Sequence, residues 1–241
     1  MAADSSVIRD PCSAPAALPA HVAIIMDGNR RWAAARGLPQ TVGHKRGLEA
    51  AKAVVKHASG MGIRYVTLYT FSTENWKRTE EEVGFLMNLV MTHLRAEMDF
   101  YRKNNIRVRF LGRAEDLPAN VSREIDGVCA ATAGFPGMCV NLAINYGGRD
   151  EIIRAVKKLS PADIAGLTEE NFASFLDIPD LPPVDLLIRT GGDQRISNFL
   201  LWQSAYAELY FSSALWPDWN GECLEQAVAD FAGRERRFGG Q

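Results

Sequence analysis

The chain has 241 residues, of which 47% are hydrophobic and 23% are charged, a composition typical of one sizeable globular domain. Its formal net charge of -2 gives no overall attraction to nucleic acid, so any anion binding must come from local clusters of arginine. No apolar run approaches the roughly 18–20 residues of a membrane span. The four cysteines and four histidines have no metal-ligand spacing, which argues against a zinc site or a disulfide framework. A cytoplasmic protein with reduced thiols is therefore expected.

The first 20 residues are rich in Ala, Pro and Ser and lack the basic start and long apolar core of a signal peptide. They predict a disordered N-terminal tail. The rest of the chain, residues 21–241, shows no internal repeat and only one short Pro-rich segment. It is expected to form a single domain.

Strand-like and helix-like segments alternate through this domain. Apolar runs predict strands at 22–26, 65–71, 106–111, 138–145, 184–188 and 206–211. Helical periodicity predicts helices at 43–59, 80–103, 117–132, 149–159 and 222–235. The order predicts an α/β fold with a mostly parallel central sheet flanked by helices. Ligands bind such sheets beyond the carboxyl ends of the strands, where several polar clusters of this chain are expected to meet.

The first cluster lies in His21–Ala33, which reads HVAIIMDGNRRWA. An apolar strand ends at Asp27, Gly28 and Asn29 suit a tight turn, and a helix carrying two arginines can follow. A carboxylate beside exposed amides and guanidinium groups can hold Mg²⁺ and a phosphate together. The alternative is that Asp27 only caps the next helix.

The segment Ser72–Arg78, STENWKR, follows the second predicted strand. Trp76 suits a partly apolar substrate or a lid that excludes water, and Asn75 could orient a substrate atom; a solvated loop is the alternative. His44, after Gly43, could donate a hydrogen bond or move a proton beside a bound diphosphate. It could instead be a surface residue at the start of a helix.

The segment Arg189–Asn198, RTGGDQRISN, follows the fifth predicted strand. Two arginines bracket a Gly-Gly turn, and guanidinium groups bind phosphate oxygens in a bidentate manner. A structural ion-pair loop is the alternative. Glu208 lies in an apolar stretch, so it is expected either to pair with an arginine or to bind a metal. Arg237 and Gly239 could approach an anion or simply end a basic helix.

Several blocks of the sequence resemble the signature motifs of the cis-prenyltransferases, the undecaprenyl diphosphate synthase family. These blocks are HVAIIMDGNRRWA, GHKRG, LYTFSTENWKR, NYGGR and RTGGDQRISNFLLWQSAYAELYF, and the resemblance runs from about His21 to Gly240. By contrast, no dinucleotide-binding GxGxxG, Walker or GxSxG motif is present. The resemblance implies a homodimer with a hydrophobic tunnel above the active site. It also implies that isopentenyl diphosphate is added in cis geometry to an allylic diphosphate, usually farnesyl diphosphate, with Mg²⁺.

The resemblance also assigns roles to individual residues. It implies Asp27 and Asn75 as catalytic residues, and Asp27 and Glu208 as carboxylates linked to the metal. Asparagine is a poor base, so Asn75 is expected to orient the substrate while a diphosphate oxygen or Asp27 accepts the proton. The implied substrate-binding residues are Gly28, Asn29, Arg30, Arg31, Trp32, His44, Ser72, Thr73, Glu74, Trp76, Arg78, Arg189, Arg195, Ile196, Ser197, Arg237 and Gly239.

Two positions depart from the family pattern. Gln40 stands where the family often has a basic residue, which puts one primer-phosphate contact in question. Asp193 and Gln194 stand where other members carry Glu-His, which bears on the details of proton relay.

The resemblance favours a long product, such as undecaprenyl diphosphate, the carrier-lipid precursor of peptidoglycan and the cell wall. A product of that kind implies transient contact with the membrane. A shorter-chain synthase is the alternative. A non-catalytic partner subunit of the same fold is less favoured because the chain keeps Asp27, Arg189, Arg195, Ser197 and Glu208. A phosphatase or general phosphate-binding module is weaker still.

Overall fold

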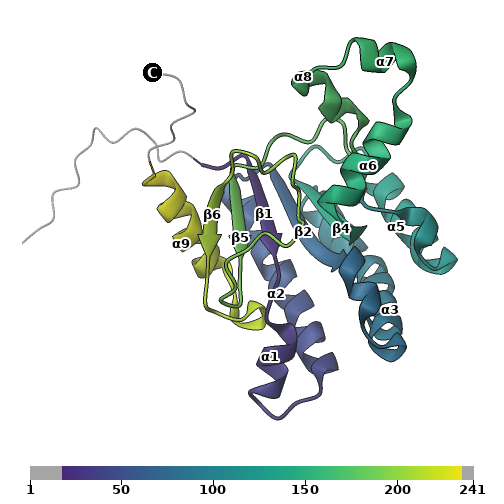
Figure 1. The fold of residues 1–241 in the computed structure, drawn as a ribbon. Coiled ribbons are helices and arrows are strands. Elements are labelled where there is room, and N and C mark those ends of the chain that lie inside the picture. The colour runs from purple at the N-terminus through teal and green to yellow at the C-terminus, as the bar shows by residue number, and fades with distance from the viewer. Residues whose placement is uncertain (1–17, 235–241) are drawn as a thin grey trace, which may run out of the picture.

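The structure, a computed structural model, describes residues 18–234 and is built on one sheet of six parallel strands (Figure 1). The strands are β1 (His21–Ile25), β2 (Tyr65–Ser72), β3 (Arg107–Leu111), β4 (Cys139–Tyr146), β5 (Leu186–Arg189) and β6 (Glu208–Phe211). Their order across the sheet is β3-β4-β2-β1-β5-β6. The six predicted strands are confirmed, with ends that shift by one or two residues. Part of the predicted N-terminal tail, residues 1–17, lies outside the described residues.

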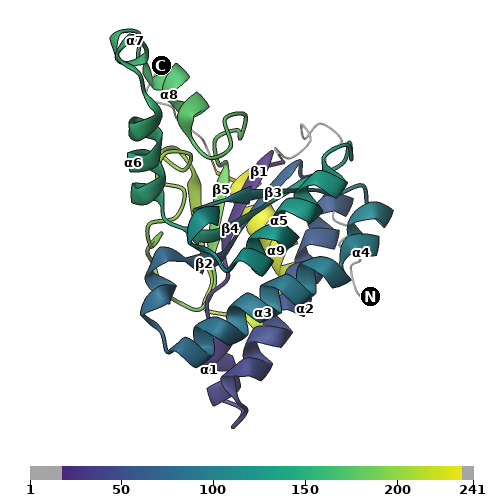
Figure 2. The same ribbon diagram turned by 90° about the vertical axis from the view of Figure 1, so that its right-hand side faces the viewer.

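Helices cover both faces of this sheet (Figure 2). They are α1 (Asn29–Ala34), α2 (Gln40–Met61), α3 (Glu80–Ala96), α4 (Met98–Lys103), α5 (Ala119–Thr132), α6 (Gly148–Lys158), α7 (Pro161–Ala165), α8 (Glu169–Phe172) and α9 (Gly221–Ala232). Helices α2 to α5 lie on one side of the sheet, and α6 to α8 lie on the other. No helix within residues 18–234 combines the length and apolar character needed to cross a bilayer.

The helix predictions are confirmed except in two places. The single helix predicted over 80–103 is divided at Glu97, whose ψ of 6° departs from helical geometry and which forms an ion pair with Lys52. The short helices α7 and α8 are absent from the sequence prediction. Each begins with a capping box, from Ser160 and from Thr168, and such local signals are too brief to produce a clear apolar period.

The strands are apolar on both faces, as expected for a covered parallel sheet. All five residues of β1 are buried, and its side chains alternate between two clusters. Val22 and Ile24 pack with the helices α2 to α5 and α9, whereas Ala23 and Ile25 pack with Phe199 and the other loop residues of the opposite face. The two cores thus bury β1 on both faces of the sheet.

A narrow apolar cavity of about 60 Å³ lies between the sheet and helices α2 to α4. Its wall includes Ala51 and Val55 of α2, Leu94 of α3, and Leu68 and Leu142 of the sheet. The cavity lies on the face of the sheet that helices α2 to α5 cover. The cavity is too small for a long hydrocarbon chain, which would fit only if the cavity widened.

A buried row of polar side chains joins the amino ends of β1, β2 and β4. The His21 ring lies 2.8 Å from the Pro182 carbonyl oxygen and 2.7 Å from the Thr67 hydroxyl, and Asn141 donates to the same hydroxyl at 3.0 Å. The carbonyl can only accept, so Nδ1 of His21 carries the proton and Nε2 accepts from Thr67. Burial lowers the pKa of His21 to about 4, which keeps the ring neutral at physiological pH.

His21 should make the folded state sensitive to acid. The unfolded chain binds a proton near pH 6.5, whereas the folded chain resists protonation down to about pH 4. The free energy of unfolding should therefore fall as the pH drops from 6.5 toward 4, and His21 should account for about 2 kcal/mol of that loss at pH 5. Urea denaturation between pH 7.5 and pH 5 measures it. The variant His21→Asn should lose this part of the slope, and an unchanged slope would contradict the assignment.

Candidate active site

Four polar segments meet at the carboxyl edge of the sheet. Asp27 follows β1, Ser72–Arg78 extends from the end of β2, Asn145–Gly148 spans the end of β4, and Arg189–Gly192 continues from β5. All these strands are parallel, so their ends lie on one edge. The edge is where an open α/β sheet binds its ligand.

Thr190 anchors the backbone of Asp27. The Thr190 hydroxyl donates to the Asp27 carbonyl oxygen at 2.7 Å and lies 3.0 Å from the Asp27 backbone nitrogen, which donates to it. Thr190 is fully buried, so these bonds are shielded from water. The sequence places Thr190 in the polar segment after the fifth predicted strand but assigns it no role, because a threonine next to a strand end carries no signal of a partner far along the chain.

The Asp27 carboxylate lies between two arginines. Its Oδ2 accepts a hydrogen bond from Arg189 at 2.9 Å, and its Oδ1 lies 3.1 Å from Nη2 of Arg31. Partial burial works to raise the pKa of Asp27, but the hydrogen bonds and charges of Arg189 and Arg31 outweigh it and hold the pKa below its usual value. Asp27 is therefore ionised at neutral pH.

Glycines bring α1 close against α2. A Cβ atom at Gly43 would lie 2.1 Å from the Asn29 carbonyl oxygen, and one at Gly47 would lie 2.3 Å from Asn29 Oδ1. Gly28 has a φ of +115°, and a Cβ there would lie 2.9 Å from Leu215. Glycine alone fits these positions. The close approach keeps Arg30 and Arg31 of α1 beside the end of β1.

A pocket of about 600 Å³ opens in front of this contact. Its lining comes from the end of β1, α1, the start of α2 and the turn before α3: Met26, Asp27, Gly28, Asn29, Arg30, Arg31, Ala34, Leu38, Gln40, His44 and Arg78. Three of these side chains are guanidinium groups, so the pocket favours an anion. Gln40, the position where the family often has a basic residue, lies in this lining.

Glu82 of α3 organises the cationic side of the pocket. This buried carboxylate accepts a hydrogen bond from Arg78 at 2.9 Å, lies 3.7 Å from Nε2 of His44 and lies 3.9 Å from Arg30. Burial and the neighbouring charge of Arg78 lower the pKa of His44. Sequence reasoning missed Glu82; its position four residues after Arg78, at the start of a predicted helix, was the available signal.

Arg189 is the centre of a second cationic group on the other side of Asp27. One of its Nη atoms donates to the Ser197 hydroxyl and to the Arg195 carbonyl oxygen, both at 2.6 Å, and the other donates to Asp193 at 3.1 Å as well as to Asp27. Arg195 also hydrogen-bonds Asp193 and is itself exposed. Arg189, Arg195 and Ser197 thus lie together, as the sequence predicts.

The turn after β2 is held by its own side chains. Asn75 Oδ1 accepts a hydrogen bond from the Ser72 backbone at 3.0 Å, and Asn198 donates to Glu74 at 3.2 Å. A Cβ at Gly147 would lie 2.9 Å from the Thr73 hydroxyl, so this turn also lies against the segment after β4. The carbonyl of Asn75 is occupied by the backbone, which leaves its amide NH₂ as the group able to face a substrate.

Trp76 is tied to the end of β4. Its indole N–H donates to Asn145 Oδ1 at 2.7 Å, and its ring packs edge-on against Phe71. Asn145 in turn donates to the Arg113 carbonyl oxygen at 3.0 Å. Trp76 lines a neighbouring groove between α3 and α5 together with Arg78.

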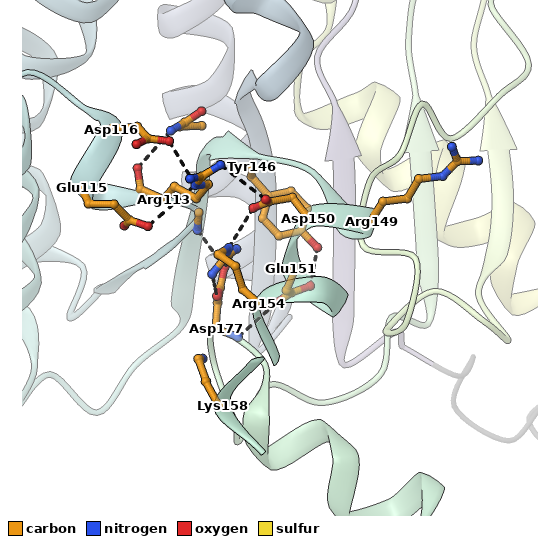
Figure 3. A network of polar contacts seen from close by, with 12 residues as sticks. Arg113, Glu115, Asp116, Tyr146, Arg149, Asp150, Glu151, Arg154, Lys158 and Asp177 are labelled. Atoms are coloured by element: carbon orange, nitrogen blue, oxygen red, sulfur yellow. Dashed lines mark hydrogen bonds and ion pairs between the residues drawn. The ribbon is translucent and has the colours of Figure 1, made fainter. Parts of the chain in front are cut away.

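A polar network behind Asn145 stiffens this end of the sheet (Figure 3). Tyr146 donates to the buried carboxylate of Glu151 at 2.6 Å, and Arg154 bonds both Asp150 and Asp177. Burial raises the pKa of Glu151, although Tyr146 bonds to it. Arg149 points away from this network in Figure 3.

Some predicted site residues lie elsewhere in the described chain. The indole N–H of Trp32 donates to Asp218 at 2.6 Å and its ring packs under Arg36, so it does not line the pocket. Ile196 packs against the apolar cluster that contains Phe199, on the face of the sheet opposite helices α2 to α5. Arg237 and Gly239 lie outside the described residues.

Glu208 lies at the opposite end of the sheet from Asp27. It begins β6, level with Leu186, and accepts a hydrogen bond from Arg234 at 2.9 Å. Asp27 follows Ile25, which is level with Arg189. The two carboxylates are therefore separated by roughly 10 Å or more along the strands and about 10 Å across them. Within one chain they are too far apart to share a metal ion.

Asp27 alone of the predicted metal ligands fits a divalent cation at the pocket. No group of three or more His, Cys, Asp or Glu side chains within residues 18–234 could form a metal site. Mg²⁺ commonly uses one or two carboxylates together with substrate phosphates and waters, so a single carboxylate in an anion pocket suits it.

The arrangement can bind two anions at once. Arg30, Arg31 and Arg78 line one pocket, Arg189 and Arg195 form a second cationic group that is paired with Asp193, and Asp27 lies between the two. A negatively charged leaving group on one side could be stabilised while a second anionic substrate is held beside it.

Comparison with known proteins identifies relatives across almost the whole chain. A family model described as "Putative undecaprenyl diphosphate synthase" matches residues 25–239. An isoprenyl transferase of Treponema denticola is 56% identical over 219 residues, which cover 91% of this chain and 96% of that protein.

Two solved structures share the fold. Lavandulyl diphosphate synthase from Lavandula x intermedia, in complex with dimethylallyl diphosphate, matches with a TM-score of 0.89 and 35% identity, covering 92% of this chain and 99% of that one. A Campylobacter jejuni protein described as "a probable undecaprenyl diphosphate synthase" matches with a TM-score of 0.78 and 37% identity over the same shares.

Gly43→Ala tests whether close packing of α1 on α2 forms the anion pocket. The new Cβ would meet the Asn29 backbone, so α1 should shift, unfolding should become easier by about 1–3 kcal/mol, and inorganic diphosphate should bind about tenfold more weakly by calorimetry. Gly60→Ala in the same helix is the control, because no atom lies within 4 Å of its Cβ. It should leave diphosphate binding unchanged; equal binding by both variants would refute this role for Gly43.

Proposed function

This chain belongs to the undecaprenyl diphosphate synthase family of prenyltransferases, and we propose that it adds isopentenyl diphosphate in cis geometry to an allylic diphosphate primer, farnesyl diphosphate. The observation that carries the proposal is the pair of cationic groups on either side of Asp27. One group lines the pocket in front of α1, and the other is paired with Asp193, which a second anion could displace. A condensation of two diphosphates uses both.

We assign the primer's diphosphate to the pocket of Arg30, Arg31, Arg78 and His44. The C–O bond to this diphosphate breaks during the reaction, so negative charge builds up on the leaving group. Guanidinium groups held in place by Glu82 stabilise that charge without having to reorganise. Neutral His44 can donate one further hydrogen bond.

We assign isopentenyl diphosphate to Arg189, Arg195 and Ser197. Asp193 now occupies the guanidinium groups of both arginines, so the incoming diphosphate must displace it or bind alongside it. The double bond of this substrate attacks the primer carbon, a new carbon–carbon bond forms, and a proton is then lost. A diphosphate oxygen or Asp27 accepts that proton, and the free amide NH₂ of Asn75 orients the substrate.

Asp27 is the residue proposed to hold Mg²⁺. When bound, the ion would neutralise the diphosphate and make it a better leaving group. Glu208, the other carboxylate that the family resemblance links to the metal, is paired with Arg234 at the far end of the sheet. It could share an ion with Asp27 only if the two belonged to different copies of the chain.

We propose a long product, such as undecaprenyl diphosphate for peptidoglycan synthesis, whose tail would fill a tunnel formed by widening the apolar cavity beneath α3. Apolar walls beside the site also keep water from the allylic cation. A shorter product is the second candidate. The narrow cavity and the structural likeness to lavandulyl diphosphate synthase support that alternative.

Chromatography of the products made from radiolabelled isopentenyl diphosphate, farnesyl diphosphate and Mg²⁺ tests the activity and the chain length. Asp27→Ala should reduce kcat by a factor on the order of 100 or more, while primer binding persists. Asp126→Ala, which removes an exposed carboxylate of α5, is the control and should turn over normally. Normal turnover by Asp27→Ala would refute its role. Phosphate release without any elongated product would instead indicate a phosphatase.

We also propose that the protein works as a cytoplasmic homodimer that contacts the membrane transiently. Exposed apolar side chains gather on α6 and in the segments that follow it: Ile153 and Val156 are about half exposed, and Ile164 of α7 is more so. Apolar surface of this kind is typical of a protein–protein interface. In a symmetric dimer the same face of each copy would be covered.

Light scattering should therefore report a dimer for the unmodified chain. Replacing both Ile153 and Val156 by Glu should place charges in the interface and produce a folded monomer. Leu18→Glu, which changes another exposed leucine, is the control and should remain dimeric. A dimer that survives the double replacement would exclude this face of α6 as the interface.

A further inference from the structure

Only a few side chains separate the apolar cavity from the outside of the molecule. Four residues line both the cavity and an outer groove of about 550 Å³ between α2 and α3: Leu48, Lys52, His93 and Glu97. The wall between the cavity and the groove is thus one side chain thick at these four residues, and we call it the Lys52–Glu97 seam. Figure 2 shows the two helices lying alongside each other here.

The seam is closed by an ion pair of modest strength. Lys52 Nζ lies 2.6 Å from Glu97 Oε2, and His93 lies 4.0 Å from the other Glu97 oxygen. Lys52 is 43% exposed, so water competes for its ammonium group on the open side of the pair, whereas Glu97 is 13% exposed. Helix α3 also packs more extensively on α5 than on α2. The α2–α3 side is therefore where the cavity opens most easily.

The outer groove combines apolar and basic side chains. Leu48 and Leu89 line it, and Lys45, Lys52 and Lys56 lie on one side of α2 because they are spaced by seven and four residues. Glu49 is paired with Arg46, and Glu97 with Lys52. Lys45 and Lys56 have no ion-pair partner among residues 18–234. With three lysines and two glutamates, the groove lining carries a formal charge of +1.

We propose that the α2–α3 groove docks on the surface of an anionic bilayer, and that the Lys52–Glu97 seam is the side opening through which the hydrocarbon tail of the product enters the lipid. The inference rests on the proposed function, because a polyprenyl tail is what needs an apolar destination. It adds to that function a specific lipid-facing surface and a route from the cavity.

The chemistry of the groove favours lipid over other anionic partners. Lysine is a flexible point charge that suits a fluid layer of head groups, whereas the groove lining includes no arginine fork to hold a fixed phosphate in bidentate geometry. Leucines at its floor suit the acyl boundary beneath the head groups. The whole chain has a net charge of -2, so attraction to an anionic surface must be local to this groove.

Co-sedimentation of the full chain with vesicles tests the docking surface. The protein should sediment with an equal mixture of phosphatidylcholine and phosphatidylglycerol more than with phosphatidylcholine alone, and high salt should release it. In the double variant Lys45→Glu/Lys56→Glu, loss of the two lysine charges alone should weaken vesicle binding by a factor of about 30, which is about fivefold for each lysine. Repulsion between the new carboxylates and the anionic lipid should weaken binding further. The control Arg64→Glu/Arg123→Glu changes the charge by the same amount at two exposed positions, one before β2 and one on α5, and should bind normally.

Failure to sediment with the anionic vesicles, or equal loss in the control variant, would overturn the proposal. The side opening has its own readout: anionic vesicles should accelerate transfer of labelled product from the protein to lipid, and the Lys45→Glu/Lys56→Glu variant should lose that acceleration. Vesicle binding is measured without substrates. A protein that binds vesicles but makes no polyprenyl product would therefore refute the proposed function and the exit route, and leave the docking surface standing. One that makes product without binding would refute this inference alone.

Discussion

The ion pair between Asp27 and Arg189 is the interaction on which the rest of the site depends. Arg189 is only 4% exposed, and a buried guanidinium is costly unless carboxylates and other acceptors surround it. Asp27, Asp193, Ser197 and the Arg195 carbonyl oxygen supply those acceptors. Since β1 and β5 are neighbours, the pair links the turn after one strand to the loop after the other. The same pair joins the two proposed diphosphate sites.

Contacts to the backbone around Asp27 hold this pair in position. Thr190 ties the Asp27 backbone to β5, and Gly43 allows α1 to lie directly against α2. The arginines of α1 are thereby held at the end of β1 before any ligand arrives, which lowers the entropy cost of binding. On the opposite side of the pocket, Glu82 brings α3 into the same arrangement. Movement of α3 would therefore affect both the pocket and the apolar cavity, and so couple the reacting end of a substrate to the space for its tail.

Most of the fold could be predicted because strong local patterns determine it. Continuous apolar runs identified all six strands, and 3.6-residue periodicity identified the longer helices. The short helices α7 and α8 escaped prediction because capping boxes act over four residues and carry little periodic signal. Within the site, carboxylate and amide side chains that follow strands, such as Asp27 and Asn75, were identified. Thr190 and Glu82 were not, because each acts through partners that are adjacent only in the folded chain.

The sequence by itself determined the family, the parallel sheet and the residues available at its carboxyl edge. These depend on local patterning and on motifs that are contiguous in the chain. Tertiary structure alone decided which of those residues meet: it joined Asp27 to Arg189, turned the indole of Trp32 toward Asp218, and separated Glu208 from Asp27 within one chain. The physical reason is that strand order and register set distances between residues more than a hundred positions apart. No local pattern in the sequence encodes those distances.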